Sequence, residues 1–171
     1  MPIILLADAG HLVTLAYADA LDLLFIPGWS VQLVDMVVYE VERHETPTSQ
    51  KITAWIKQHA IPVLNSKIYQ RYSKALAAGQ MPRKANLGEL AIQEVMHEFV
   101  LCDPPQIGVF LFEDHKIARV SFVLPEHCRK VSTRAFLLFL QHQGWIESAT
   151  EIESRAIRAG RTFSQLRFPP D

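Results

Sequence analysis

The sequence predicts an α/β protein, a three-layer α/β/α sandwich built around a mostly parallel sheet. Two observations favour this fold class. Short apolar runs alternate with segments of helical periodicity through most of the chain, which is typical of strands connected by helices. The first run, residues 3–7, is continuously apolar, as expected of a strand that is buried on both faces. We expect residues 1–130 to form the α/β core and residues 131–171 to extend the same domain with C-terminal helices.

The first half of the chain contains three expected strands and three expected helices. Pro27-Gly28 and residues 46–49 are the clearest breaks between them, because proline and glycine interrupt both periodicities. In chain order, the sequence predicts a strand over 3–7, a helix over 11–24, a strand over 31–34, helices over 36–45 and 50–59, and a strand over 61–64.

The second half completes an expected sheet of about five strands. Ser66 is a suitable N-cap for a helix that continues to residue 78, and Gly79 is a suitable stop. The segments that follow are a loop over 80–84, a helix over 87–100, a strand over 108–112, a short helix over 113–119, a last strand over 120–124, helices over 133–143 and 146–159, and a loose tail over 167–171.

Composition and charge exclude several classes of protein. The chain has 171 residues and carries 17 Lys and Arg against 18 Asp and Glu, so its net charge of −1 excludes a strongly basic, DNA-coating protein. Two cysteines are too few for a disulfide framework or a four-cysteine zinc site. The most apolar long stretch, residues 12–29, is interrupted by Asp19 and Asp22, so we expect no membrane span. We expect a cytoplasmic protein, because residues 1–8 lack the basic region of a signal peptide.

Acidic residues follow three of the expected strands. Asp8 follows the first strand, Glu40 lies about one helical turn into the helix after the second, and Asp114 follows the fourth. In open parallel sheets, binding sites form in the crevice outside the carboxyl ends of the strands. We therefore expect these three carboxylates to meet at that edge of the sheet.

Glu89 is the fourth candidate. In a helix that starts at Leu87 and turns by about 100° per residue, Glu89 lies beside Met96 inside the apolar arc. It is the one charge on the face that we expect to be buried. Each acid also has a structural interpretation. Asp8 and Asp114 could cap helices, Glu40 could be a solvated helical residue, and Glu89 could simply favour a helix N-terminus.

Taken together, the four acids favour a metal site. Clustered carboxylates repel one another unless a cation balances them or some stay protonated. Oxygen ligands suit Mg²⁺ or Mn²⁺. Such an ion lowers the pKa of a bound water and screens the charge that develops on a phosphoryl group. The sequence therefore predicts metal-dependent phosphodiester hydrolysis.

Four segments, in this order along the chain, carry a resemblance to a known family: Leu6-Ala7-Asp8-Ala9-Gly10, Val37-Val38-Tyr39-Glu40-Val41, Leu87-Gly88-Glu89-Leu90-Ala91-Ile92 and Phe110-Leu111-Phe112-Glu113-Asp114. They resemble the four motifs of the PIN-domain ribonucleases, the family of the VapC-like toxins of bacterial toxin–antitoxin pairs. The resemblance covers residues 3–145.

This resemblance implies a five-stranded parallel sheet and a Mg²⁺- or Mn²⁺-dependent endoribonuclease. It implies that the metal is held by the four acids, which are then the catalytic residues: Asp8, Glu40, Glu89 and Asp114. It also implies RNA as the substrate, a homodimer, and an antitoxin protein as an inhibiting partner.

Two other functions remain open from the sequence. Gly10 stands where many relatives carry Ser, Thr or Asn, and His11 follows it. This departure motivates the hypothesis of a catalytically inactive PIN-like module that binds or regulates without cutting. The third hypothesis is a metal-dependent phosphohydrolase that acts on a small phosphate ester.

Basic residues near tyrosines are candidates for RNA contacts. Tyr69 and Tyr72 lie within a basic segment, which would suit base stacking and phosphate binding, with Lys67, Arg71, Lys74, Arg83 and Lys84. The alternative is an ordinary amphipathic helix, because Tyr69, Tyr72 and Leu76 have the spacing of core residues. Near the C-terminus, contacts with RNA, with an acidic partner or with solvent are equally open for Arg155, Arg158 and Arg161.

Overall fold

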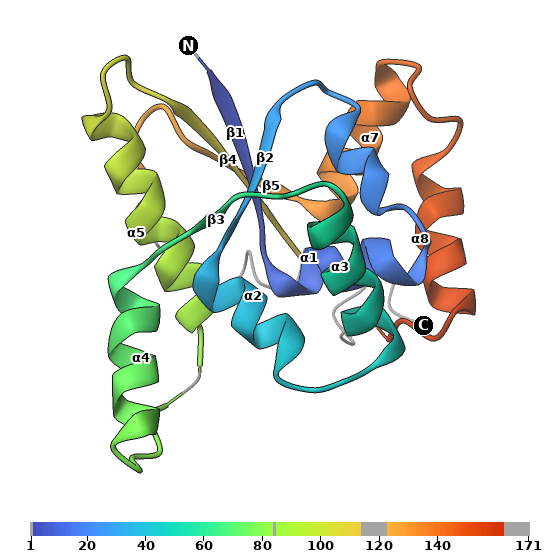
Figure 1. Cartoon of the computed structure of the whole chain (residues 1–171). Helices are drawn as coiled ribbons and strands as arrows, with labels where there is room; N and C mark the ends of the chain where they lie inside the picture. The colour runs from blue at the N-terminus through green and yellow to red at the C-terminus, as the bar shows by residue number, and fades with distance from the viewer. Residues whose placement is uncertain (1, 84, 114–122, 163–171) are drawn as a thin grey trace.

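A five-stranded sheet in which all strands are parallel forms the centre of the computed structural model, which describes residues 2–83, 85–113 and 123–162 (Figure 1). The strand order is β3-β2-β1-β4-β5. The strands are β1 (Ile3–Ala7), β2 (Ser30–Val34), β3 (Val63–Leu64), β4 (Ile107–Phe112) and β5 (Arg129–Ser132). The predicted fold class is confirmed.

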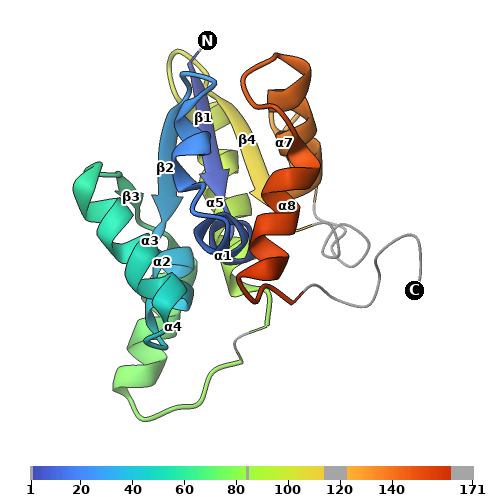
Figure 2. The ribbon, with the colours of Figure 1, turned by 90° about the vertical axis from the view of Figure 1, so that its right-hand side faces the viewer.

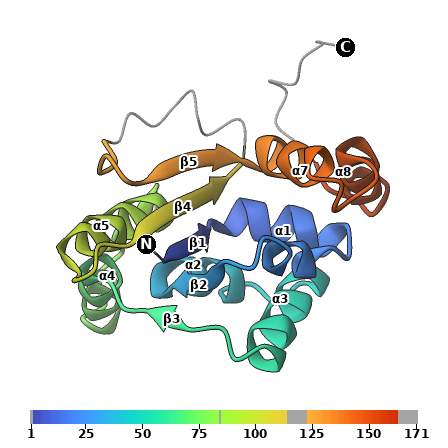
Figure 3. The same ribbon diagram turned by 90° about the horizontal axis from the view of Figure 1, so that it is seen from above.

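Helices cover both faces of this sheet. Figure 3 shows α4 and α5 on one side, and α1, α3, α7 and α8 on the other. Helix α2 contacts β2, β3 and α5. None of the described helices is long and apolar enough to cross a membrane. Their bounds are α1 (Ala9–Tyr17), α2 (Asp35–Glu42), α3 (Pro47–Gln58), α4 (Lys67–Ala77), α5 (Leu87–Leu101), α7 (Thr133–His142) and α8 (Ala149–Arg158).

The core lies on both faces of the central strands, which explains why β1 is a continuous apolar run. Leu5 and Leu6 point to opposite faces of the pleated strand, and both are fully buried. The surrounding helices supply further fully buried side chains, which include Leu12, Leu15, Ile92, Met96 and Phe136. Strand β5 runs from Arg129 to Ser132, so the sheet takes residues from both sides of the expected division at residue 130.

Two helix starts follow from local chemistry. The hydroxyl of Ser66 accepts a hydrogen bond from the amide of Tyr69, so the predicted N-cap of α4 is confirmed. Helix α3 begins before the expected residue 50. Thr46 and Ser49 form a reciprocal capping box and Pro47 occupies the first turn, where its missing N–H costs nothing.

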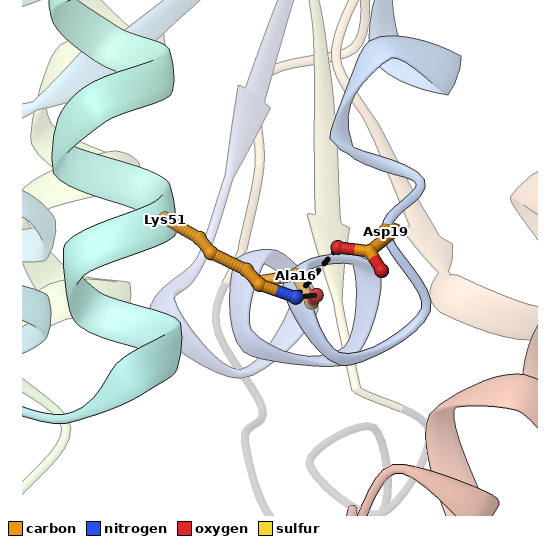
Figure 4. Close-up of polar contacts among 3 residues, drawn as sticks. All are labelled: Ala16, Asp19 and Lys51. Carbon is orange, nitrogen blue, oxygen red and sulfur yellow. Dashed lines mark hydrogen bonds and ion pairs between the residues drawn. The ribbon is translucent and has the colours of Figure 1, made fainter.

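The expected helix over 11–24 is wrong in length. Helix α1 ends at Tyr17, and a separate 3₁₀-helix, η1 (Leu21–Phe25), follows. Asp19 adopts a left-handed backbone with a φ of 50°, which a continuous helix does not permit. Lys51 on α3 reaches the end of α1, where its ammonium donates to the carbonyl of Ala16 and pairs with Asp19 (Figure 4).

The expected last strand over 120–124 is also corrected. Residues 120–122 lie outside the described residues, while Val123 and Leu124 belong to no strand. The fifth strand is β5, whose register pairs Val109 with Arg129 and Phe112 with Ser132. Its sequence, Arg-Lys-Val-Ser, is polar because it is an edge strand, so hydrophobicity gives no indication of it. In the expected helix over 113–119, Glu113 is not helical, and the rest lies outside the described residues, as does the tail over 167–171.

The burial of β1 leads to a stability prediction. Leu5→Ala removes a fully buried side chain from the central strand and should lower the free energy of unfolding by about 2–5 kcal/mol. The matched control is Leu101→Ala at the end of α5, where the side chain is 84% exposed, and we expect a change within about 0.5 kcal/mol. Urea unfolding of both variants measures the difference. Equal effects would contradict the assignment of β1 to the core.

Candidate functional site

The carboxyl edge of the sheet collects polar residues because every strand ends there. Asp8 directly follows β1, Asp35 follows β2, Glu113 follows β4 and Thr133 follows β5. The chain runs from β1 through β2 to β3 on one side and from β4 to β5 on the other, so the topology switches between β1 and β4. Figure 2 shows β1 ending at α1, and α1 contacts both β4 and α8. Asp8 and Glu113 therefore lie at the switch point.

Asp8 is buried, with 2% of its surface exposed, and it has a clear structural role. Its Oδ1 accepts a hydrogen bond of 2.8 Å from the amide of His11, so it caps α1. Its own amide donates to the carbonyl of Leu111 at 2.9 Å, which extends the pairing of β1 with β4 by one residue. The cap fixes one carboxylate oxygen of Asp8 at the switch point.

Glu40 lies against the start of α5, the helix whose first turn carries Glu89. The residue before α5, Asn86, makes no side-chain capping bond, and Glu40 from α2 accepts from the amide of Gly88 at 3.2 Å instead. A Cβ atom at position 88 would lie 2.7 Å from Glu40 Oε2, so the Glu40 carboxylate would have to shift if residue 88 carried a side chain. Glu89 is 5% exposed in the first turn, which agrees with its predicted position on the buried face. Glu40 is therefore a helix cap as well as a site candidate.

Asp114 lies outside the described residues, so its position is a prediction. Its neighbour Glu113 is 3% exposed, and Glu113 Oε1 accepts two hydroxyl hydrogen bonds, from Thr14 at 2.6 Å and from Thr133 at 3.0 Å. Burial raises the pKa of Glu113, and the two hydroxyls and the nearby Arg161 lower it in part. Charged Asp8 raises it further, which agrees with their shared position at the switch point.

Gly10 makes room for the side chain of Glu113. A Cβ atom at position 10 would lie 2.9 Å from Glu113 Cγ and 3.6 Å from Asp8 Oδ1. The Glu113 side chain thus crosses the first turn of α1 and reaches Thr14, one helical turn beyond Gly10. The glycine that departs from the family motif is therefore matched to this buried glutamate.

His11 is a buried, neutral residue. Its Nδ1 lies 2.9 Å from the hydroxyl of Thr133, and its ring packs edge-on against Phe136. Burial lowers the pKa of His11 to about 3. Within the described part of the chain, His11 Nε2 is a buried side-chain atom without a hydrogen-bond partner. His11 therefore serves the packing of α1 against α7.

The candidate carboxylates occupy two places. Asp8 lies near Glu113, whereas Glu40 contacts Gly88, the residue before Glu89. Among residues 2–83, 85–113 and 123–162, no set of three or more His, Cys, Asp and Glu side chains is arranged to hold a metal ion. The structure thus brings Asp8, Glu40 and Glu89 to one edge of the sheet, but not into a single cluster of the described residues.

The basic helix α4 is partly a core element. Tyr72 is 3% exposed, and its hydroxyl lies 3.5 Å from that of Tyr39 on α2, whose ring also contacts Tyr69. The core interpretation is confirmed for Tyr72, whereas Leu76 is exposed. The side chains of Lys67, Arg71, Lys74 and Arg83 are exposed, and Lys84 lies outside the described residues.

Sequence reasoning missed the polar partners of Glu113. Thr14 occupies an apolar helix face, and Thr133 follows a strand that the apolar pattern does not reveal. Arg161 follows α8 and donates to Thr14, although the two residues are far apart in the chain. Glu113 itself directly follows an apolar strand, which is the same indication that selected Asp8.

The fit between Gly10 and Glu113 can be tested by a double-mutant cycle. Gly10→Ala should cost about 1–3 kcal/mol of stability, because the new methyl group overlaps a side chain whose carboxylate is fixed by two hydroxyls. In a Glu113→Ala background the same substitution should cost much less. Thermal or urea unfolding measures both. An equal cost in the two backgrounds would contradict the fit.

The buried His11 predicts an acid-sensitive fold. Its folded-state pKa of about 3 lies below the usual value near 6.5, so the folded protein binds fewer protons than the unfolded chain. The stability from neutral His11 is complete above about pH 6.5, and it is lost by about 1.4 kcal/mol per pH unit as the pH falls toward 3. His11→Asn should reduce this slope, as measured by urea unfolding. The same slope in both proteins would contradict the burial.

Comparison of the chain with protein-family models, with curated proteins and with solved structures finds no match. The resemblance to the PIN-domain ribonucleases therefore stays a prediction from the four motifs. The arrangement of carboxylates at the carboxyl edge of the sheet is the basis on which a function can be proposed.

Proposed function

We propose that the protein is a metal-dependent endoribonuclease that hydrolyses RNA phosphodiester bonds at the carboxyl edge of its sheet. One observation carries the proposal. Asp8 and Glu89 are almost fully buried at this edge, and Glu40 lies against the start of the helix that carries Glu89. Buried carboxylates are costly unless hydrogen bonds or cations compensate them, so an edge rich in them is suited to a cation.

The donor chemistry fits Mg²⁺ or Mn²⁺. The candidate ligands offer only carboxylate oxygens, and Mg²⁺ is commonly held by one or two carboxylates, with waters and substrate phosphates completing its shell. It therefore does not require the compact set of three side chains that the described residues lack. The residues that would hold one or two such ions are Asp8, Glu40, Glu89 and Asp114. When bound, the ion supplies an acidified water and neutralises charge on the phosphate.

The chain's own residues support this role in distinct ways. The cap on α1 fixes one carboxylate oxygen of Asp8 at the switch point. The amide of Gly88 holds the Glu40 carboxylate against the first turn of α5, the turn that carries Glu89. Fixed carboxylates of this kind lower the entropic cost of organising a reaction site.

The same proposal extends to the partners. RNA is favoured over a small ester because α4, which contacts α2 near Glu40, exposes Lys67, Arg71 and Lys74, and such a row of cations suits a phosphate backbone. By resemblance to the toxins of toxin–antitoxin pairs, the proposal includes a homodimer, an inhibiting antitoxin and a cytoplasmic location.

A non-cutting module is the competing function, and one observation favours it. Both described acids at the switch point spend one oxygen on structural bonds, Asp8 on the cap of α1 and Glu113 on two threonine hydroxyls. Carboxylates with such structural hydrogen bonds would be retained even in a protein that has no catalytic activity.

Cleavage of a mixed single-stranded RNA tests the proposal. Wild-type protein should cut with Mn²⁺ and not with EDTA. Asp8→Asn keeps an oxygen for the cap, and Glu89→Gln keeps the shape, so both should fold. Each should lose more than about a hundredfold in rate, because a ligand contributes several kcal/mol to stabilising the transition state.

The matched control is Glu98→Gln, which removes an exposed carboxylate from the same helix as Glu89 and should leave the rate unchanged. Cleavage that survives in folded Asp8→Asn would refute the assignment. Absence of cleavage and of Mn²⁺ binding in folded wild-type protein would favour the non-cutting module.

A further inference from the structure

A chain of hydrogen bonds ties the segment after α8 to the first turn of α1. Arg161 donates through Nε to Thr14 Oγ1 at 3.0 Å and through Nη2 to the carbonyl of Gly10 at 3.4 Å. Both acceptors belong to α1. The fork of one guanidinium thus spans one turn of the helix that Asp8 caps.

The hydroxyl of Thr14 connects two opposite charges. It has one proton, which it donates to Glu113 Oε1, and its lone pair accepts from Arg161. The Thr14 hydroxyl thus bridges the guanidinium of Arg161 and the carboxyl group of Glu113. Thr14 is fully buried, so these bonds lie in a medium where charge-assisted hydrogen bonds are strong.

A second hydroxyl completes the arrangement on the other side of Glu113. The Thr133 hydroxyl has two acceptors within reach, Glu113 Oε1 at 3.0 Å and the carbonyl of Phe112 at 3.2 Å, and it lies 2.9 Å from His11 Nδ1. The carboxylate is therefore held between α1 and the start of α7. These four side chains, hereafter the α1 latch, are Arg161, Thr14, Glu113 and Thr133.

We infer that the α1 latch positions Asp8. The latch joins α1 to the end of β4, to α7 and to the segment after α8, so it fixes how the short helix α1 sits over the switch point. Asp8 is the N-cap of that helix, and its carboxylate moves with the first turn. This role in the site rests on the proposed function, whereas the hold on the first turn of α1 does not. Arg161, Thr14 and Glu113 are then positioning residues.

Two substitutions at Thr14 separate the hydroxyl from the packing. Thr14→Val keeps the shape of the side chain and removes the hydroxyl, while Thr14→Ser keeps the hydroxyl and removes a methyl group. If Thr14 serves only to fill space, serine should be the more damaging change. If the Thr14 hydroxyl is part of the latch, Thr14→Val should be the more damaging change.

Amide hydrogen exchange measures how firmly the α1 latch holds the first turn of α1. The amides of His11 and Leu12 donate to the side chain and carbonyl of Asp8, so their exchange reports on the cap. In folded protein they should exchange at least about tenfold faster in Thr14→Val and in Arg161→Gln than in wild type, and near the wild-type rate in Thr14→Ser. The control, Arg158→Gln, removes an exposed arginine that pairs with Glu151 on α8, and it should change nothing.

Two experiments test whether the α1 latch positions Asp8: titration with Mn²⁺ in the absence of RNA, and single-turnover cleavage of RNA. Thr14→Val and Arg161→Gln should bind Mn²⁺ about tenfold or more weakly, as removal of an outer-shell partner commonly does. The rate at saturating RNA should fall by a similar factor, with the RNA concentration for half-maximal rate unchanged.

The outcomes are separable. Unchanged exchange at His11 and Leu12 in both variants overturns the latch. If the amides of His11 and Leu12 exchange faster in the variants but the Mn²⁺ affinity is unchanged, the inference that the latch positions Asp8 is wrong. If wild-type protein neither binds Mn²⁺ nor cuts RNA, the proposed function and the positioning role fail together, while the exchange pattern still decides whether the latch holds α1.

Discussion

The parallel pairing of β1 with β4 is the interaction on which the rest of this structure depends. It joins residues about a hundred positions apart, with Ile3 opposite Ile107 and Ala7 opposite Leu111. Since the two strands run in the same direction, both deliver a carboxylate to the same edge at the point where the chain reverses its order across the sheet. The amide of Asp8 bonds to the carbonyl of Leu111, so the ladder continues into the site itself.

A buried charge at such an edge has to be compensated, and here the fold does so with hydroxyls and an arginine. Glu113 receives two threonine hydroxyls and lies near Arg161, yet burial still raises its pKa. Removing a partner from a buried charge is more harmful than removing the whole group, because the desolvated charge is left without compensation. The groups around Glu113 therefore act as a unit, and their hydrogen bonds fix α1, β4 and α7 relative to one another.

Several carboxylates in this protein cap the N-terminus of a helix other than the element that carries them. Glu40 from α2 supplies the cap that Asn86 does not give to α5, and Glu94 from α5 accepts from the first amides of α4. Asp35 at the end of β2 binds both the amide and the hydroxyl of Ser66. Helix capping and cation binding use the same carboxylate oxygens. An acid at a strand end therefore predicts that the residue lies at the carboxyl edge of the sheet, but it does not predict which of the two roles the residue has.

Local patterns in the sequence are enough to predict the fold class, the core strands and the edge at which Asp8, Glu40 and Glu89 lie. Apolar runs and helical periodicity are local properties, and they sufficed for β1, for the start of α5 and for the burial of Glu89. The remaining features depend on contacts between residues that are far apart in the chain, so no local pattern predicts them. Strand β5 exists through its pairing with β4, α1 stops where Asp19 turns and Lys51 binds, and Glu113 is held by hydroxyls that no spacing rule connects. Gly10 illustrates the division: the sequence shows only a missing side chain, and the packed structure shows the glutamate that needs its space.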